Sequence, residues 1–225
     1  MRVLAASDAY PLWAANYSAE TAVSSIENEL VAALTPRLAG LRLLDAGCGT
    51  GRRLREVQAE QAVGIDSCGE MIAAGAPDLK GHARVKTLIA DVRATPFADG
   101  SFDVVWCRLV IGHVADARSV YGELARVTAP GGRVIVSDFH EDAYAVGHRR
   151  TFRAHDGVVE VQHHVHSLSA QLRYAGDAGL QAVAVREGRV GASVEPFYRS
   201  SGMGDRFSEH LGLAVVLALS FQRSA

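Results

Sequence analysis

The chain has 225 residues, of which 48% are hydrophobic and 21% charged, a balance typical of one globular domain with a full apolar core. Its net charge of −2 argues against a nucleic-acid partner, because clustered basic residues bind a phosphate backbone. Three cysteines, an odd number, argue against a disulfide framework and favour a reducing, cytoplasmic location.

Residues 1–40 are expected to be mostly helical. Residues 1–6 are too short for the apolar core of a signal peptide before Asp8 interrupts them. The clearest helix covers residues 24–38, where Ser24 or Ser25 would cap the start. Its apolar side chains recur on one face: Ile26, Leu30, Val31 and Leu34.

Residues 41–51, L-R-L-L-D-A-G-C-G-T-G, combine an apolar run and Asp45 with glycines at three alternate positions: Gly47, Gly49 and Gly51. Such a run is typical of a buried parallel strand, and closely spaced glycines let the backbone turn tightly against a ligand. A helix expected over residues 52–62 would complete a nucleotide-type site. A dinucleotide fingerprint would need glycine where Arg52 stands, and a carboxylate beside the turn favours a cationic or amine-bearing ligand.

The motif D-A-G-C-G-T-G resembles the first motif of the class I S-adenosylmethionine-dependent methyltransferases, in particular the type 11-like enzymes that act on small molecules. The resemblance implies S-adenosyl-L-methionine as cofactor, with the three glycines, Asp45 and Cys48 around it. It also implies an α/β fold: a Rossmann-like, seven-stranded, mostly parallel sheet whose last strand is antiparallel, with helices on both faces. An N-terminal helical flap and a hairpin insertion after the fifth strand complete the expectation. In the aromatic-rich residues 10–17, we expect Tyr17 to close over the cofactor and Trp13 to pack.

A second strand is expected at residues 62–66. It ends in Asp66, 21 residues after Asp45, near the offset at which a carboxylate reaches ribose hydroxyls. Alternatively, Asp66 or Ser67 caps the helix expected at residues 69–76. Both residues are kept as cofactor contacts, as is Met71, which would face the adenine or fill the core.

A third strand, residues 84–91, ends in Asp91. The sequence D-V-R-A-T-P-F that begins there resembles the family's adenine-binding segment, which implies contacts from Asp91 and Val92. Asp91 alternatively forms a simple turn. Because three successive strands would each end in aspartate, a shared ligand edge is the preferred interpretation.

The fourth and fifth strands are expected at residues 101–107 and 133–138, with a helix at 114–128 that the Pro and Gly of residues 129–132 end. The resemblance covers roughly residues 10–140. It implies that residues 107–113 line the methyl donor and the acceptor, with Cys107 at the cofactor.

The remaining third begins with a hairpin, because Asp-Gly between alternating runs is a strong hairpin signal. Its strands are expected at residues 149–154 and 158–166. The later elements are a helix at 167–179, a sixth strand at 181–186, a mobile loop at 188–204 and an antiparallel seventh strand at 211–221. The most apolar stretch, residues 211–219, falls short of the roughly 20 residues of a membrane helix, so we expect no membrane contact.

Three histidines, His163, His164 and His166, occur within four residues. On a strand, His164 and His166 would share one face while His163 points the other way. Their spacing matches no standard zinc pattern, so we expect no metal site.

We expect a single methyltransferase domain over residues 1–225. Its parts would be an N-terminal cap (1–40), a cofactor-binding core (41–138) and acceptor-side lid segments (139–166 and 188–210). His113 and His140 are candidate general bases, because both follow strand ends and imidazole titrates near neutral pH. The family-like setting L-x-x-G-H-V-x-D also fits an architectural role for His113. Acceptor contacts are expected from Tyr10, Arg149, His164 and Tyr198.

The preferred function is methyl transfer to an oxygen, hydroxyl or carboxylate, of a small molecule. Carbon or nitrogen methylation of a metabolite is the runner-up, and a carboxylate on a carrier protein is a further acceptor class. The rival classes are a cofactor-binding pseudo-enzyme without turnover and a nicotinamide oxidoreductase, against which Arg52 counts. The sequence leaves the oligomeric state open.

Overall fold

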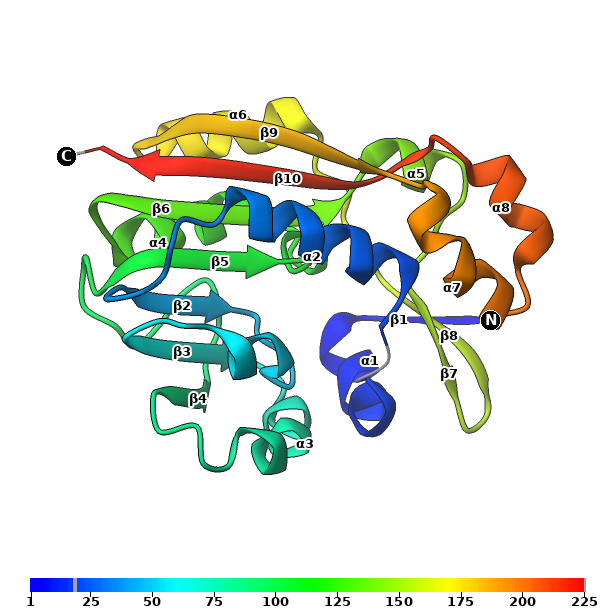
Figure 1. The fold of residues 1–225 in the computed structure, drawn as a ribbon, viewed down its shortest axis with the longest axis horizontal. Helices are drawn as coiled ribbons and strands as arrows, with labels where there is room; N and C mark the ends of the chain where they lie inside the picture. Colours follow the sequence, from blue (N-terminus) through cyan, green and yellow to red (C-terminus); the bar gives the residue numbers. More distant parts are fainter. Residues whose placement is uncertain (18–19, 225) are drawn as a thin grey trace.

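The computed structural model is built on a central seven-stranded sheet, whose strand order is β4-β3-β2-β5-β6-β10-β9 (Figure 1). The structure describes residues 1–17 and 20–224; residues 18, 19 and 225, which the predicted cap and domain bounds include, lie outside the described residues. The strands are β2 (Arg42–Ala46), β3 (Gln61–Asp66), β4 (Val85–Ile89), β5 (Phe102–Arg108), β6 (Thr128–Phe139), β9 (Leu180–Arg189) and β10 (Ala214–Arg223). Strand β10 runs antiparallel to both neighbours and the other pairs are parallel, which confirms the predicted Rossmann-like α/β fold.

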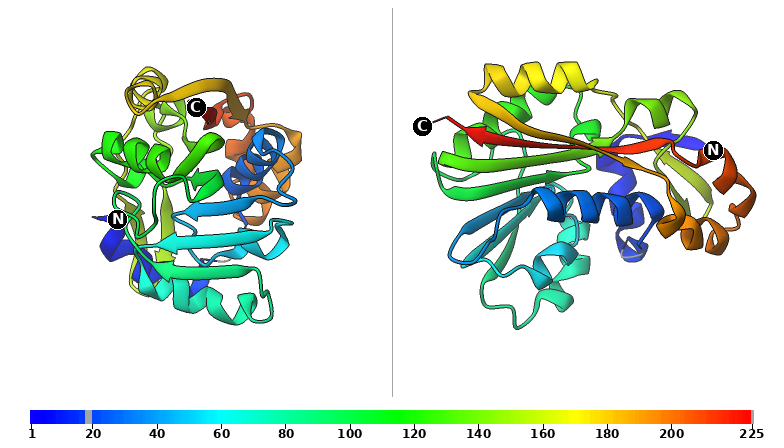
Figure 2. Two further views of the ribbon diagram at one scale, coloured as in Figure 1. Left: turned by 90° about the vertical axis from the view of Figure 1, so that its left-hand side faces the viewer. Right: turned by 45° about the horizontal axis from the view of Figure 1, so that its top comes forward.

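Helices cover both faces of this sheet (Figure 2). Successive strand residues point to opposite faces, so Leu44 packs with the cluster under α4 (Ala117–Val127) and α6 (Leu168–Asp177). Leu43 faces the other way, into the cluster that includes Val31 of α2 (Ala22–Leu34). The central strands are therefore buried on both sides, as their near-continuous apolar runs predict.

Helix α2 begins earlier than the sequence predicts. Its N-cap is Thr21, whose Oγ1 accepts the Ser24 backbone N–H at 3.1 Å. The Ser24 hydroxyl in turn accepts the Thr21 N–H at 2.8 Å, which completes a capping box. The prediction of Ser24 or Ser25 as the cap is therefore wrong, because Ser24 occupies the third helical position.

A second, three-stranded sheet with the order β1-β8-β7 lies beside the main one. It contains the predicted hairpin, now β7 (Thr151–Ala154) and β8 (Gly157–Val161), and a short N-terminal strand β1 (Arg2–Leu4) that pairs parallel with β8. The sequence predicted mostly helix in residues 1–40 and no strand here, because three residues are too few to show a strand pattern. Helix α1 (Ala6–Trp13) follows and packs against both the hairpin and α3 (Gly69–Leu79).

Two other predicted elements are wrong. The helix expected at residues 52–62 is a single 3-10 turn, Arg52–Glu56, because Val57 adopts extended backbone (φ −72°, ψ 135°). The loop expected at residues 188–204 is largely ordered: α7 (Glu195–Ser200) starts with a proline in its first turn, and α8 (Gly204–His210) follows.

The Pro-Gly segment, residues 129–132, lies within β6 after α4 has already ended. A further short helix, α5 (Glu141–Ala145), connects β6 to the hairpin.

Among the described residues, no helix combines the length and apolar character needed to span a bilayer.

Candidate functional site

The turn after β2 needs its glycines. Gly47, Gly49 and Gly51 have φ values of 85°, 58° and 70°, in the left-handed region that side chains disfavour. A Cβ on Gly47 would also lie 2.2 Å from Cγ2 of Val110. The turn is anchored by the backbone N–H of Gly47, which donates to the Ile65 carbonyl at 2.8 Å.

Two carboxylates, Asp45 and Asp66, flank this turn and differ in their hydrogen bonding. Asp45 is wholly buried, and neither carboxylate oxygen has a hydrogen-bond partner in the described part of the chain. Burial raises the pKa of Asp45 to about 6, although the positive charges of Arg108 and Arg53 oppose the rise. Asp66 instead accepts backbone N–H groups from Gly49 (2.8 Å) and Cys68 (2.9 Å), and thereby ties the turn to the start of α3.

The residues predicted to contact the adenine make fewer hydrogen bonds with the glycine turn than Asp66 does. The N-cap of α3 is Cys68, so neither Asp66 nor the exposed Ser67 holds that position. Asp91 follows β4, next to β3, and is bound by Arg93 through its guanidinium (2.6 Å) and backbone N–H (2.8 Å). The turn-forming alternative for Asp91 is thus realised in this structure, beside the buried side chain of Val92.

Aromatic and apolar side chains cover the turn. A Cβ built on Gly49 would lie 3.4 Å from Cε1 of Tyr17 and 3.9 Å from Cε of Met71, so both residues face this glycine. Tyr17 belongs to an aromatic group in which Trp13 stacks on Phe152 of the hairpin at 4.8 Å between ring centroids. The N-terminal segment is therefore held between the glycine turn and the hairpin.

The two buried cysteines at the site are not thiolates. Burial raises the pKa of the Cys48 thiol well above its usual value, and the nearby Asp45 carboxylate adds to the rise. Burial also raises the pKa of Cys107. Both side chains therefore serve as small apolar groups under the turn.

The end of β5 is strained. Leu109 is buried with a φ of 57°, a left-handed conformation that costs a non-glycine residue about 1–2 kcal/mol. Its backbone N–H donates to the Ser137 carbonyl at 2.8 Å. Such strain is often found at functional turns. This one directs the following residues, up to His113, toward the hairpin.

Five polar residues from distant parts of the chain meet beside this turn, and we call them the Arg150 cluster: Tyr10, His113, Asp138, Arg150 and His163. The Tyr10 hydroxyl accepts from Arg150 Nη1 (2.7 Å) and lies 2.8 Å from His113 Nε2. His163 Nε2 lies 4.0 Å from the Asp138 carboxylate. Three nitrogen atoms of the cluster are buried without a partner in the described chain: His113 Nδ1, His163 Nδ1 and Arg150 Nε.

Burial sets the charge states in the Arg150 cluster. It holds the pKa of His113 well below its usual value, assisted by the charge of Arg150. The same causes lower the pKa of His163 to about 4. Burial raises the pKa of Asp138 to about 7, opposed by the Phe139 backbone N–H and by Arg150. At neutral pH both imidazoles are therefore uncharged, and Asp138 is near its midpoint.

Three other predicted site residues lie in different surroundings. His140 caps α5: its Nδ1 accepts the Asp142 N–H at 3.1 Å, and its Nε2 lies 3.6 Å from Glu187. The Arg149 guanidinium lies 3.7 Å from the centre of the Tyr144 ring. The Tyr198 hydroxyl lies 3.1 Å from His210 Nδ1, between α7 and α8.

The histidine run does not lie on a strand, since β8 ends at Val161. The predicted face-sharing of His164 and His166 is therefore wrong. His164 approaches the site only through its backbone N–H, which donates to the Gly112 carbonyl at 2.7 Å. Within the described ranges, no group of three or more metal-ligating side chains converges.

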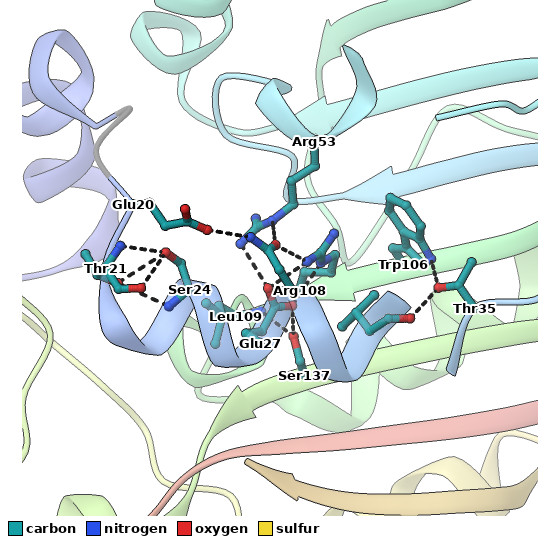
Figure 3. Close-up of polar contacts among 12 residues, drawn as sticks. Glu20, Thr21, Ser24, Glu27, Thr35, Arg53, Trp106, Arg108, Leu109 and Ser137 are labelled. Atoms are coloured by element: carbon teal, nitrogen blue, oxygen red, sulfur yellow. Dashed lines mark hydrogen bonds and ion pairs between the residues drawn. The ribbon is translucent and has the colours of Figure 1, made fainter. Parts of the chain in front are cut away.

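A second buried network lies on the opposite face, under α2 (Figure 3). Glu27 accepts two hydrogen bonds from Arg108 (2.9 and 2.7 Å), one from Arg53 (3.1 Å) and one from the Ser137 hydroxyl (2.6 Å). Burial alone would raise the pKa of Glu27, but the charges and hydrogen bonds of both arginines hold it at about 2. The sequence analysis missed this network. Its one signal is an acidic residue four positions before Val31 in an apolar stripe.

Comparison with known proteins agrees with this geometry. Residues 44–136 match the family model described as a methyltransferase domain. The chain is 31% identical over 141 residues to malonyl-acyl-carrier protein O-methyltransferase of Erwinia billingiae, covering 62% of this chain and 55% of that protein. The chain spans about half the length of the curated relatives it matches.

Solved structures show the same fold. An S-adenosylmethionine-dependent methyltransferase from Mesorhizobium loti superposes with a TM-score of 0.69 at 20% identity, covering 88% of this chain and 98% of that one. Geranyl diphosphate C-methyltransferase from Streptomyces coelicolor gives a TM-score of 0.64 at 18% identity, covering 89% and 80%. Residues 44–136, which contain the glycine turn, therefore match a methyltransferase domain, and the sheet order is that of a fold shared with S-adenosylmethionine-dependent methyltransferases of known structure.

Proposed function

We propose that this protein transfers the methyl group of S-adenosylmethionine to a small-molecule acceptor, with oxygen as the preferred acceptor atom. The observation that carries the proposal is the Asp45 carboxylate, buried without a partner beside the glycine turn. A buried unpaired carboxylate is costly, and a cationic ligand would offset that cost. The amino-acid portion of S-adenosylmethionine carries such a cation, an ammonium that also donates hydrogen bonds, and a dinucleotide cofactor has no ammonium.

The other residues around the turn fit the rest of this cofactor. Each oxygen of Asp66 accepts one backbone N–H and keeps lone pairs free, which suits a ribose diol. Met71 and Tyr17 offer apolar surface next to Gly49. The proposed contacts also include the Gly47–Gly51 backbone, Ser67, Asp91, Val92 and the apolar Cys48 and Cys107.

The bound cofactor supplies an electrophilic methyl group, so the chain's own task is to hold and align the acceptor. The Arg150 cluster joins Tyr10 of the N-terminal segment to His113 in the loop after β5, whose Val110 packs on Gly47, and we place the acceptor there. Of the two histidines proposed as a base, His113 belongs to this cluster, and its lowered pKa keeps the imidazole neutral. Asp138, with a pKa of about 7, is suited to take a proton near neutral pH. His140 contacts Asp142 and Glu187 instead.

Carbon methylation is the second candidate, because a base such as Asp138 can also deprotonate a carbon acid. A solved neighbour named as a C-methyltransferase shares the fold, and fold alone does not fix the acceptor atom.

Calorimetric titration of the full chain with S-adenosylhomocysteine and with NAD tests the cofactor. We expect saturable binding of the former and none of the latter; the reverse result would overturn the proposal in favour of an oxidoreductase. Incubation of labelled S-adenosylmethionine with a metabolite extract then tests turnover against a heat-denatured control. Binding without label transfer to any extract fraction would identify a pseudo-enzyme.

A further inference from the structure

We propose that Arg150 is an anion-binding residue of the acceptor pocket, and that the acceptor therefore carries a carboxylate held by this guanidinium. The inference rests on the proposed function only for the role of the bound anion as methyl acceptor. The binding site itself follows from the geometry around Arg150.

The guanidinium of Arg150 is only partly used. Its Nη1 donates to the Tyr10 hydroxyl at 2.7 Å, and its plane lies over the Phe139 ring, with 5.1 Å from Cζ to the ring centroid. Its Nε is buried and has no partner among the described residues. Nε and Nη2 form the side-on edge of a guanidinium, which pairs with both oxygens of a planar carboxylate.

The charge of Arg150 lacks a partner in the described protein. No carboxylate oxygen of the described residues lies within 4.0 Å of its nitrogen atoms, as the ion pairs of the chain show. The nearest candidate, Asp138, accepts the Phe139 backbone N–H at 2.8 Å and is turned toward His163. Since burial raises the pKa of Asp138 to about 7, this group carries only part of a charge at neutral pH.

Arg108 shows how the same fold treats a buried arginine that has a structural role. Its guanidinium donates from Nε and Nη2 to the two oxygens of Glu27, at 2.9 and 2.7 Å. The same two atoms of Arg150 face no carboxylate. Arg150 is partly exposed, but its Nε is buried without a partner among the described residues, and such an atom costs stability unless a ligand pairs with it. The difference between the two arginines therefore points to an anionic ligand at Arg150.

The neighbouring histidines suit the same ligand. His113 Nε2 accepts the Tyr10 hydroxyl proton, because that hydroxyl already accepts from Arg150; the neutral ring then carries its hydrogen on Nδ1. Within the described chain, His163 Nδ1 is buried without a partner; His113 Nδ1 makes no hydrogen bond of normal geometry, although the Gln162 backbone lies near enough to His113 to raise its pKa. The centroids of the two rings lie 6.2 Å apart, so the two histidines are neighbours. A planar carboxylate fits a site of one guanidinium fork better than a phosphate dianion does.

Titration of the full chain with acetate tests the site, read on the Nε–H signals of its arginines in nitrogen–proton correlation spectra. The Arg150 signal is assigned with Arg150→Lys, and Arg153→Lys on the exposed edge of the same hairpin gives the matched control. We expect a saturable shift of the Arg150 signal, at concentrations about tenfold or more below those for acetamide, its uncharged analogue. Sodium chloride controls for ionic strength, and methyl phosphate tests the anion class.

Equal responses to acetate and acetamide, or no saturable shift at Arg150, would overturn the inference. A stronger response to methyl phosphate would overturn the carboxylate assignment. The S-adenosylhomocysteine titration is read separately on the same sample. Cofactor binding without an acetate response contradicts only the role of Arg150, whereas an acetate response without cofactor binding contradicts only the proposed function.

Discussion

The Tyr10 hydroxyl lies 2.8 Å from His113 Nε2, although 103 positions separate the two residues in the chain. This contact joins the N-terminal segment to the loop after β5. Arg150 donates to the same hydroxyl and adds the hairpin to the junction. One phenol therefore connects three segments that surround the candidate site.

Tyr10→Phe removes that hydroxyl while keeping the ring. We expect a loss of about 1–3 kcal/mol in the free energy of unfolding, because two buried partners each lose a hydrogen bond. Amide hydrogen exchange should accelerate in α1, the segment that the hydroxyl anchors. Tyr174→Phe, on the remote helix α6, serves as the control. Unchanged exchange in α1 would show that the aromatic contacts alone hold the segment.

Asp45→Asn should stabilise the protein and weaken cofactor binding. The pKa of Asp45 is about 6 in the folded protein and near 3.8 in an unfolded chain, so the folded state binds more protons between these values. Stability is therefore lost as pH rises from about 4 to 6, and the loss persists above that range.

At pH 8 the uncharged variant should gain on the order of 1–3 kcal/mol in unfolding free energy. Its affinity for S-adenosylhomocysteine should fall about tenfold or more, since the partner of the ammonium is gone. Urea denaturation and calorimetry measure the two effects. A variant that is less stable than wild type at pH 8, or that binds equally well, would contradict this account.

Glu27→Gln should destabilise the fold strongly. The variant leaves Arg108 and Arg53 buried without a negative charge, and breaking one side of a buried ion pair costs about 3–5 kcal/mol. Glu29→Gln, on the exposed face of the same helix, should change stability by less than about 0.5 kcal/mol. Urea denaturation midpoints of both variants, compared with that of wild type, measure the two effects.

Glu27 also predicts an acid limit. Its pKa is about 2 in the folded protein, below the usual 4.5, so its contribution is complete above the usual value and is lost as pH falls toward 2. The unfolding free energy of Glu27→Gln should therefore fall less than that of wild type as pH is lowered from about 4.5 toward 2. Parallel acid titrations would contradict this.

The glycine turn and the aspartates at the strand ends could be predicted from sequence because their signals are local. Each aspartate lies at or just after the carboxyl end of its strand, and the parallel order of β2, β3 and β4 then brings Asp45, Asp66 and Asp91 to one edge. The glycine turn needs only its own dihedral angles.

The Arg150 cluster could not be predicted because long-range packing assembles it. Arg149 and Arg150 are adjacent, and side chains alternate near a strand, so one position decides which arginine faces the site. The sequence favoured Arg149, whereas the structure places Arg150 against Tyr10 and leaves Arg149 over Tyr144. The same limit hid His163, whose ring lies against Gly112 rather than on the predicted strand.

Gly112→Ala should displace His163 from its buried position. A Cβ on Gly112 would lie 1.8 Å from Cε1 of His163, so the ring or the backbone must move. Overpacking of this kind costs about 1–3 kcal/mol. Since burial is the main reason that the pKa of His163 is about 4, a displaced ring should titrate closer to the ordinary histidine value of 6.5.

Nitrogen-detected NMR titration of the histidine side chains measures this shift. Gly122→Ala is the matched control, because a Cβ there meets no atom within 4 Å and alanine favours the interior of α4. The control should keep the low pKa of His163 and lose no stability. If Gly112→Ala leaves that pKa near 4, the space left by glycine is not what keeps the His163 ring buried beside Asp138. Contacts with Tyr144 and Phe139 must then hold the ring.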